Sequence, residues 1–205
     1  RYIFDQLITL QLGILGNRRD WQAVPGQSLP VEDGWLDEFL AGVFPYELTG
    51  AQKRALQDIR SDIAKEVPMN RLLQGDVGSG KTVVALRAML SVVDSSGQAA
   101  LLAPTEVLAQ QHFRTIKKLL GELAQAGTLQ AGSIGTEVEL LTGSLSTAEK
   151  KEIHAKLASG QTGIVIGTHA LISDGVTFAD LGLVVVDEQH RFGVEQRDAL
   201  RMKAK

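Results

Sequence analysis

One glycine-rich segment constrains the fold of this chain more than any other feature of its sequence. It consists of Gly75, Asp76, Val77, Gly78, Ser79, Gly80, Lys81 and Thr82. These residues match the pattern G-x-x-x-x-G-K-[ST], in which glycines let backbone N–H groups turn inward around an anion. Lys81 can then reach the β- and γ-phosphates of a nucleotide, and the Thr82 hydroxyl can hold Mg²⁺. The segment predicts a phosphate-binding loop, with all eight residues as candidate nucleotide ligands.

The sequence on either side of this segment fits the prediction. Residues 71–74 are expected to form a short strand before the loop, and residues 81–93 a buried helix after it. The N-terminus of that helix would point at the bound phosphate. The alternative is a glycine-rich turn that matches by chance. The flanking elements and a second motif further along the chain argue against it.

The second motif is an apolar run, Leu183–Val186, followed by Asp187 and Glu188. β-branched residues ending in two acids are typical of a central parallel strand whose C-terminal end opens on a ligand crevice. Asp187 would bind Mg²⁺, directly or through water, and Glu188 would orient or deprotonate the water that attacks the γ-phosphate. The alternative is a strand followed by a polar turn with two solvated acids.

Composition and length limit the remaining possibilities. A chain of 205 residues is long enough for one domain plus an appendage. No apolar run approaches the ~20 residues that span a bilayer, and the first residues lack a secretory signal. The absence of cysteine excludes disulfides and permits the cytoplasm. With a net charge of −3, binding to nucleic acid must rest on local contacts.

The pattern from residue 46 onward predicts an α/β domain, with a parallel sheet and helices on both faces. Strands are expected near 98–103, 137–141, 163–167 and 182–186, and helices near 81–93, 105–125 and 146–158. A further helix carries one apolar face, made by Ala51, Ala55, Ile59, Ile63 and Val67. Residues 127–136 are expected to be a loop. Residues 1–17 have helical apolar spacing, and 18–45 form a connector.

Five blocks together resemble the first RecA-like motor domain of superfamily 2 helicases, most closely the bacterial DNA helicases that remodel stalled replication forks. The blocks are 75–82, 103–112, 142–144, 167–171 and 187–194. Gln189 separates them from the transcription-repair coupling factor, which usually carries Glu there. The resemblance implies a three-layer P-loop NTPase fold over residues 46–205, truncated at its C-terminal end. It also implies that residues 1–45 are the linker helix and connector from a preceding wedge-like domain.

The same resemblance implies a function. The parent protein would use ATP and Mg²⁺ to move along duplex DNA and remodel branched or forked junctions. Catalysis would involve Lys81, Asp187, Glu188 and His190, and Gln52 would contact the adenine. A second RecA-like domain of the parent would complete the site. We expect this parent to be a monomeric, cytoplasmic, nucleoid-associated bacterial protein without membrane contact, and the isolated chain to be nearly inactive.

Contacts to the DNA backbone are expected from residues that follow predicted strands: Thr105, Gly143, Ser144 and Thr168. Such contacts carry no base information, so binding should be largely independent of sequence. Thr105 is equally suited to capping a helix. Gln52 likewise forms a capping box with Thr49 in the pattern T-x-x-Q. For both residues the structural role remains an alternative.

The histidines and one pair of neighbouring lysines have simple structural explanations. His112, His154 and His169 lack metal-ligand spacing and are expected to be structural, and His190 has the same alternative. Lys150 and Lys151 are expected to be solvated.

Two other functions remain open, a module that binds nucleotide without turnover and an RNA helicase motor. The RNA helicases typically carry Asp-Glu-Ala-Asp at the second motif and lack Arg191-Phe192-Gly193. The resemblance implies a further sheet strand after the second motif, and the sequence predicts no such strand before Lys205, so residues 195–205 are expected to be poorly anchored.

Overall fold

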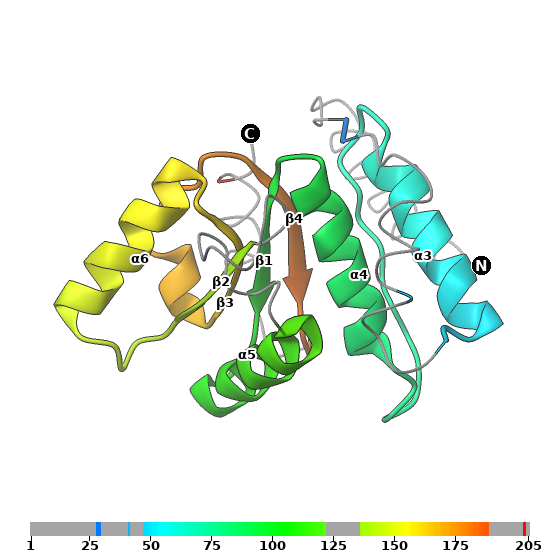
Figure 1. The fold of residues 1–205 in the computed structure, drawn as a ribbon, viewed down its shortest axis with the longest axis horizontal. Coiled ribbons are helices and arrows are strands. Elements are labelled where there is room, and N and C mark those ends of the chain that lie inside the picture. Colours follow the sequence, from blue (N-terminus) through cyan, green and yellow to red (C-terminus); the bar gives the residue numbers. More distant parts are fainter. Residues whose placement is uncertain (1–27, 30–40, 42–46, 122–135, 189–202, 204–205) are drawn as a thin grey trace, which may run out of the picture.

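The computed structural model describes residues 28–29, 41, 47–121, 136–188 and 203. Within them the chain alternates between helices and strands (Figure 1). In chain order the elements are α3 (Gly50–Ile63), α4 (Lys81–Asp94), β1 (Gln98–Leu102), α5 (Glu106–Leu120), β2 (Glu137–Leu141), α6 (Thr147–Ser159), β3 (Thr162–Gly167), the 3₁₀-helix η3 (His169–Ile172) and β4 (Leu181–Val186). These bounds confirm the predicted strands and helices from residue 81 onward to within a few residues at each end.

The four strands form one parallel sheet in the order β2-β3-β1-β4. Strands β1 and β3 are fully buried in the middle of the sheet, and β2 and β4 lie at its edges. Because all four strands run in the same direction, their C-terminal ends lie side by side at one end of the sheet. We call this end the C-terminal edge, as distinct from the outer strands β2 and β4. The loops that follow the four strands therefore lie close together, as is usual for ligand sites in such folds.

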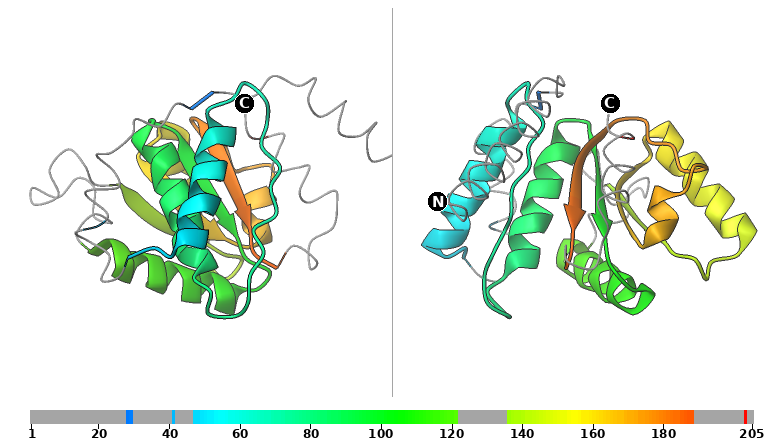
Figure 2. Two further views of the ribbon diagram at one scale, coloured as in Figure 1. Left: turned by 90° about the vertical axis from the view of Figure 1, so that its right-hand side faces the viewer. Right: turned by 180° about the vertical axis from the view of Figure 1, so that it is seen from behind.

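Helices cover both faces of the sheet and produce two apolar cores. Side chains alternate along β1: Ala99 and Leu101 lie in the first core, and Ala100 and Leu102 in the second. The first core is completed by α3, α4 and α5, and the second by α6 and η3. In Figure 1 and in the right-hand view of Figure 2 the sheet lies between α4 and α6. The three-layer α/β architecture expected from the sequence is thus confirmed.

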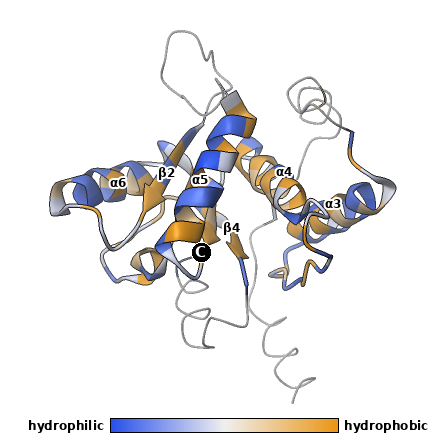
Figure 3. Cartoon of the chain, turned by 90° about the horizontal axis from the view of Figure 1, so that it is seen from below, coloured by the Kyte–Doolittle hydropathy of each residue, from blue (hydrophilic) through white to orange (hydrophobic). Residues whose placement is uncertain are grey.

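Helix α4, which follows the glycine-rich segment, is the most deeply enclosed helix of the described chain. Eight of its residues are buried, Arg87 and Ser91 among them, and its ribbon is mostly hydrophobic in colour (Figure 3). Outside it, α3 adds a further layer, and the buried Arg60 Nε donates to Ser91 Oγ at 3.1 Å. A helix that is apolar almost all round must be covered on several sides. The sheet and α3 supply that cover.

The strand predicted for residues 71–74 is wrong. The described segment 64–80 forms no strand and runs beside α3 and α4 (Figure 2, left). Within residues 71–74, Leu72 is 71% exposed and Leu73 packs against the core, as Met69 does just before them. Two apolar residues offer little surface to bury in a sheet, and Arg71 draws the segment toward α3 instead.

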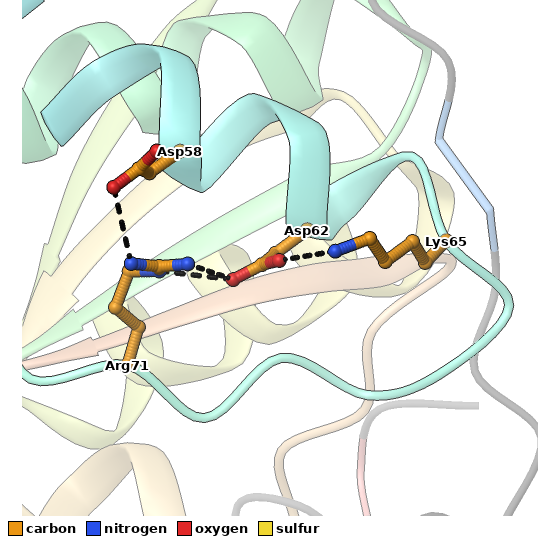
Figure 4. A network of polar contacts seen from close by, with 4 residues as sticks. All are labelled: Asp58, Asp62, Lys65 and Arg71. Carbon is orange, nitrogen blue, oxygen red and sulfur yellow. Dashed lines mark hydrogen bonds and ion pairs between the residues drawn. The ribbon is translucent and has the colours of Figure 1, made fainter. Parts of the chain in front are cut away.

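Arg71 fastens this segment to α3 through a cluster of charges (Figure 4). Its guanidinium donates to Asp62 Oδ2 at 2.9 and 2.6 Å, and lies 3.4 Å from Asp58 Oδ2. Lys65 binds the other oxygen of Asp62 at 2.7 Å. The pKa of Asp62 is lowered, chiefly by the hydrogen bond from Lys65 and then by Arg71, while burial opposes the shift. The cluster fixes the chain four residues before the glycine-rich loop.

Smaller differences concern element ends. Helix α3 stops at Ile63, so Val67 does not extend its apolar face and is 39% exposed. Helix α5 ends at Leu120, with Gly121 as its C-cap. The expected linker over residues 1–45 lies almost entirely outside the described residues, and so does nearly all of the loop over 127–136. Lys203 was expected to be poorly anchored, but its Nζ donates to the carbonyls of Ser173 and Val176, both at 2.7 Å.

No helix in the described ranges is long and apolar enough to cross a membrane.

Candidate nucleotide-binding site

The glycine-rich loop leads directly into the N-terminus of α4. Gly80 is the N-cap of this helix with φ 79°, and Gly78 has φ 81°. Both values lie in the left-handed region that glycine adopts without steric cost. No side chain caps the first turn of α4, and the first N–H groups of a helix are suited to an anion. The local sequence thus builds an anion-binding helix end.

Lys81 lies in the first turn of α4 and folds over its own loop. Its Nζ donates to the backbone oxygens of Gly75 at 2.7 Å and Asp76 at 2.8 Å. The loop is closed further by the Ser79 N–H, which donates to the Asp76 carbonyl at 3.1 Å. The ammonium group is therefore held at the loop whose amides would receive a phosphate.

Asp187 comes directly after β4 and belongs to the same site. Its N–H donates to the carbonyl of Leu102 at 2.9 Å, which continues the pairing of β4 with β1. Its Oδ2 accepts a hydrogen bond from His112 Nε2 at 2.8 Å. This bond is the main reason why the pKa of Asp187 is lowered despite partial burial, and the charge of Lys81 contributes as well. The two motifs, distant in sequence, are thus brought within electrostatic reach of each other.

The residues present fit a bound Mg²⁺. Asp187 is an ionised carboxylate, and Thr82, the second residue of α4, adds a half-buried hydroxyl. Among the residues whose placement is described, no group of three or more His, Cys, Asp or Glu side chains could hold a metal. Mg²⁺ commonly binds one or two carboxylates together with phosphate and water, so a closed protein cage is not required.

Glu188 follows Asp187 with an exposed side chain and φ 49°, a left-handed conformation that is uncommon outside glycine. Its backbone N–H donates to the Asp187 carboxylate. Gln189, His190 and residues 191–193 lie outside the described residues, and the roles given to them stay predictions.

Gln52 contacts both a helix cap and the phosphate-binding loop. Its Oε1 accepts from the N–H of Thr49 at 2.8 Å, and the Thr49 hydroxyl accepts from the N–H of Gln52, so the capping box is formed. Its Nε2 donates to the carbonyl of Ser79 at 2.8 Å. The structural alternative for Gln52 is therefore present. The adenine contact stays a prediction, and it would require the amide to share or exchange these partners.

The residues predicted to contact DNA follow β1, β2 and β3 at the C-terminal edge of the sheet. The Thr105 hydroxyl caps α5 by accepting from Leu108 N–H at 3.3 Å. The N–H of Ser144 donates to Glu106 Oε1 at 3.0 Å, and Gly143 is exposed beside it. Thr168 is 7% exposed. The topology brings these four residues to one edge, but a phosphate would have to compete with Glu106 for the Ser144 amide.

Three residues that contact the predicted site residues were not identified from the sequence. His112 was expected to be structural and touches Asp187. Glu106 received no role and holds the Ser144 amide. Lys150 was expected to be solvated, yet it is half-buried and its Nζ donates to the Gly143 carbonyl at 2.6 Å. The only signal for His112 is its place two helical turns after Thr105, and that becomes meaningful only when the order of the strands is known.

A loop closed around a lysine at a helix N-terminus, beside an acid that ends a neighbouring parallel strand, defines a P-loop nucleotide-binding domain of the RecA-like type. Comparison with known proteins narrows this class. The family description "DEAD/DEAH box helicase" matches residues 49–205, and the chain belongs to this family.

Several relatives carry the name ATP-dependent DNA helicase RecG. The protein from Mycobacterium tuberculosis is 51% identical over 204 residues, and that from Thermotoga maritima is 44% identical over 205. Each comparison covers all of this chain but only 28% and 25%, respectively, of the relative. The chain thus spans about a quarter of the length of these curated relatives. The resemblance to superfamily 2 helicases drawn from the sequence is confirmed.

Comparison with solved structures also identifies helicases. The structure described as RecG bound to a three-way DNA junction superposes with a TM-score of 0.81 at 43% identity, covering 93% of this chain and 24% of that one. The UvsW helicase of bacteriophage T4 gives a TM-score of 0.57 at 16% identity, which shows a shared fold.

Proposed function

We propose that this chain is the nucleotide-binding half of the motor of an ATP-dependent DNA helicase, and that the parent protein moves along duplex DNA and remodels branched junctions. The observation that carries the proposal is the glycine-rich loop closed around Lys81 at the N-terminus of α4, together with Asp187 directly after β4. In such motors the lysine of the phosphate-binding loop cradles the β- and γ-phosphates, and an acid from a second motif helps to hold Mg²⁺.

The chemistry follows from the charges in the site. Lys81 and the N-terminus of α4 offset the negative charge of the phosphates. Mg²⁺ would be held by Asp187 and Thr82 and would neutralise charge that develops on the transferred phosphoryl group. Glu188 is exposed directly after Asp187, where it could orient a water molecule toward the γ-phosphate. The partner domain would complete the site from the opposite side.

The assignment to DNA rests on similarity to the RecG relatives, one of which was solved with a three-way junction. The C-terminal edge of the sheet supports it through the exposed amide region at Gly143 and Ser144, with Lys150 beside it. An RNA helicase motor is a weaker proposal, because the acids are followed by Gln189 and His190 rather than Ala and Asp. A module without turnover is a possibility for the isolated chain only.

Nucleotide binding is tested by titration calorimetry with Mg²⁺-ADP. Lys81→Ala removes a charge-assisted contact worth about 1.5–3 kcal/mol, so its affinity should fall by about 10- to 150-fold. Lys118→Ala is the control, because Lys118 is an exposed lysine on α5. Equal affinity of the Lys81 variant and the unmodified chain would rule out the assigned site.

DNA contact is tested in the full-length protein by the stimulation of ATPase activity with forked DNA, single-stranded DNA and RNA. Ser144→Ala combined with Thr105→Ala should weaken stimulation by DNA and leave nucleotide affinity unchanged. Ser159→Ala is the control, since Ser159 ends α6 at the opposite edge of the sheet. Stimulation by RNA in preference to DNA would favour the second assignment.

A further inference from the structure

His112 is the residue that reaches the metal-binding candidate Asp187 from another element. It lies in the second turn of α5 and is 75 positions away from Asp187 in sequence. The His112 Nε2 to Asp187 Oδ2 distance is 2.8 Å, and the two side chains are 17% and 36% exposed. An ionised carboxylate can only accept a hydrogen bond. The ring N–H of His112 is therefore the donor.

The backbone of Asp187 is fixed independently of this contact. Its N–H is paired with the Leu102 carbonyl, so the position of its Cα is set by the sheet. The orientation of its carboxylate is set by two donors, His112 Nε2 and the N–H of Glu188. A carboxylate offers about four acceptor sites, so these bonds leave room for water or a metal ion. Among the described residues, His112 is the only one whose side chain donates a hydrogen bond to the Asp187 carboxylate.

We propose that His112 is a positioning residue that holds the Asp187 carboxylate in the orientation needed for Mg²⁺ bound with the nucleotide. The inference rests on the proposed nucleotide site and goes beyond it by assigning a role to α5. Hydrogen bonds to the ligands of a metal orient them, and removing such a partner typically costs 10- to 100-fold in metal affinity or activity. A histidine that merely filled the space between α5 and β4 would not affect the Mg²⁺ requirement separately from nucleotide affinity.

The test uses the full-length protein and a fluorescent ADP analogue. Binding is measured over a range of Mg²⁺ concentrations and again in EDTA. Two substitutions form the central pair: His112→Gln keeps an N–H donor near the place of Nε2, and His112→Met has similar bulk but no donor. His112→Ala is measured as a second variant without a donor, in case the thioether packs poorly. His154→Ala, which changes a half-buried histidine on α6 across the sheet, is the control.

The Mg²⁺ concentration for half-maximal binding should rise about 10- to 100-fold in the Met and Ala variants. The Gln variant should recover most of this loss, and the control should match the unmodified protein. Affinity in EDTA should stay within about twofold throughout. An unchanged Mg²⁺ requirement, an equal loss with and without Mg²⁺, or a Gln variant no better than Met would each overturn the role of His112. Failure of the unmodified protein to bind nucleotide would instead overturn the proposed function.

Discussion

Glu106 Oε1 accepts a hydrogen bond from the backbone N–H of Ser144 at 3.0 Å, and this bond joins the start of α5 to the loop after β2. The two residues are 38 positions apart and lie at the edge of the sheet where DNA contact is proposed. The pKa of Glu106 is lowered, first by its hydrogen bond with the Ser144 side chain. A negative charge therefore stands at the amide that would receive a DNA phosphate.

Glu106→Gln in the full-length protein should tighten binding to forked DNA at low salt by about two- to fivefold. The amide oxygen can still accept from Ser144, while the repulsion between the carboxylate and a DNA phosphate is removed. Fluorescence anisotropy at several salt concentrations is the measurement, and Glu152→Gln on the exposed side of α6 is the control. Unchanged or weaker binding would show that Glu106 does not face the DNA.

If the Gln52 amide makes a hydrogen bond to the adenine, Gln52→Ala should lower the affinity for ATP by about 2- to 12-fold. The affinity for GTP should fall less. Thr49→Ala is the matched control, because it disrupts the same capping box and leaves the Gln52 amide in place. Competition binding with ATP and GTP distinguishes adenine contact by Gln52 from its role in the helix cap. If both variants lower the two affinities equally, Gln52 acts through the cap and the Ser79 carbonyl alone.

The charge cluster at Asp62 should make stability depend on pH. Because the pKa of Asp62 is lowered in the folded chain, its contribution is complete above about pH 4, the ordinary range of an aspartate, and is lost as pH falls through the lowered value. Asp62→Asn should therefore lower Tm at pH 7, at a cost of up to about 1 kcal/mol, and the difference from the unmodified chain should shrink near pH 3. Thermal melts at both pH values test this.

The control for that experiment is Asp58→Asn. Asp58 is 63% exposed and meets Arg71 at only 3.4 Å, so the substitution should change Tm little at either pH. If Asp62→Asn lowers Tm by as much at pH 3 as at pH 7, then packing, rather than charge, holds segment 64–80 on α3.

As a separate polypeptide, the 205 residues should bind nucleotide and hydrolyse it slowly, with little stimulation by DNA. The family resemblance implies that a second RecA-like domain supplies an arginine to the γ-phosphate, and such an arginine is worth about 10³–10⁵ in rate. Comparing kcat of this polypeptide with that of the full-length protein is the measurement. Turnover at a comparable rate would place all the catalytic groups within these residues.

The sequence by itself determined the elements that depend on local chemistry. The period of the apolar residues located β1, β3, β4 and the helices that follow the loop, because burial on one or two faces imposes that period. The glycine positions and Lys81 predicted the phosphate-binding loop, since few other sequences form an anion-binding turn before a helix. Asp187 was found for a similar reason, as an acid at the end of an apolar run.

Only the tertiary structure decided which of these residues meet. The order β2-β3-β1-β4 places the end of β4 next to the end of β1, after which α5 begins, and this puts His112 on Asp187. The attachment of Arg71 to Asp62 draws residues 71–74 away from the predicted strand. Contacts of this kind join residues that are distant in sequence, and they depend on strand order and on competition between partners. The local periodicity of apolar residues predicts neither the strand order nor the outcome of this competition. It indicates which face of an element is buried, but not which other element covers that face.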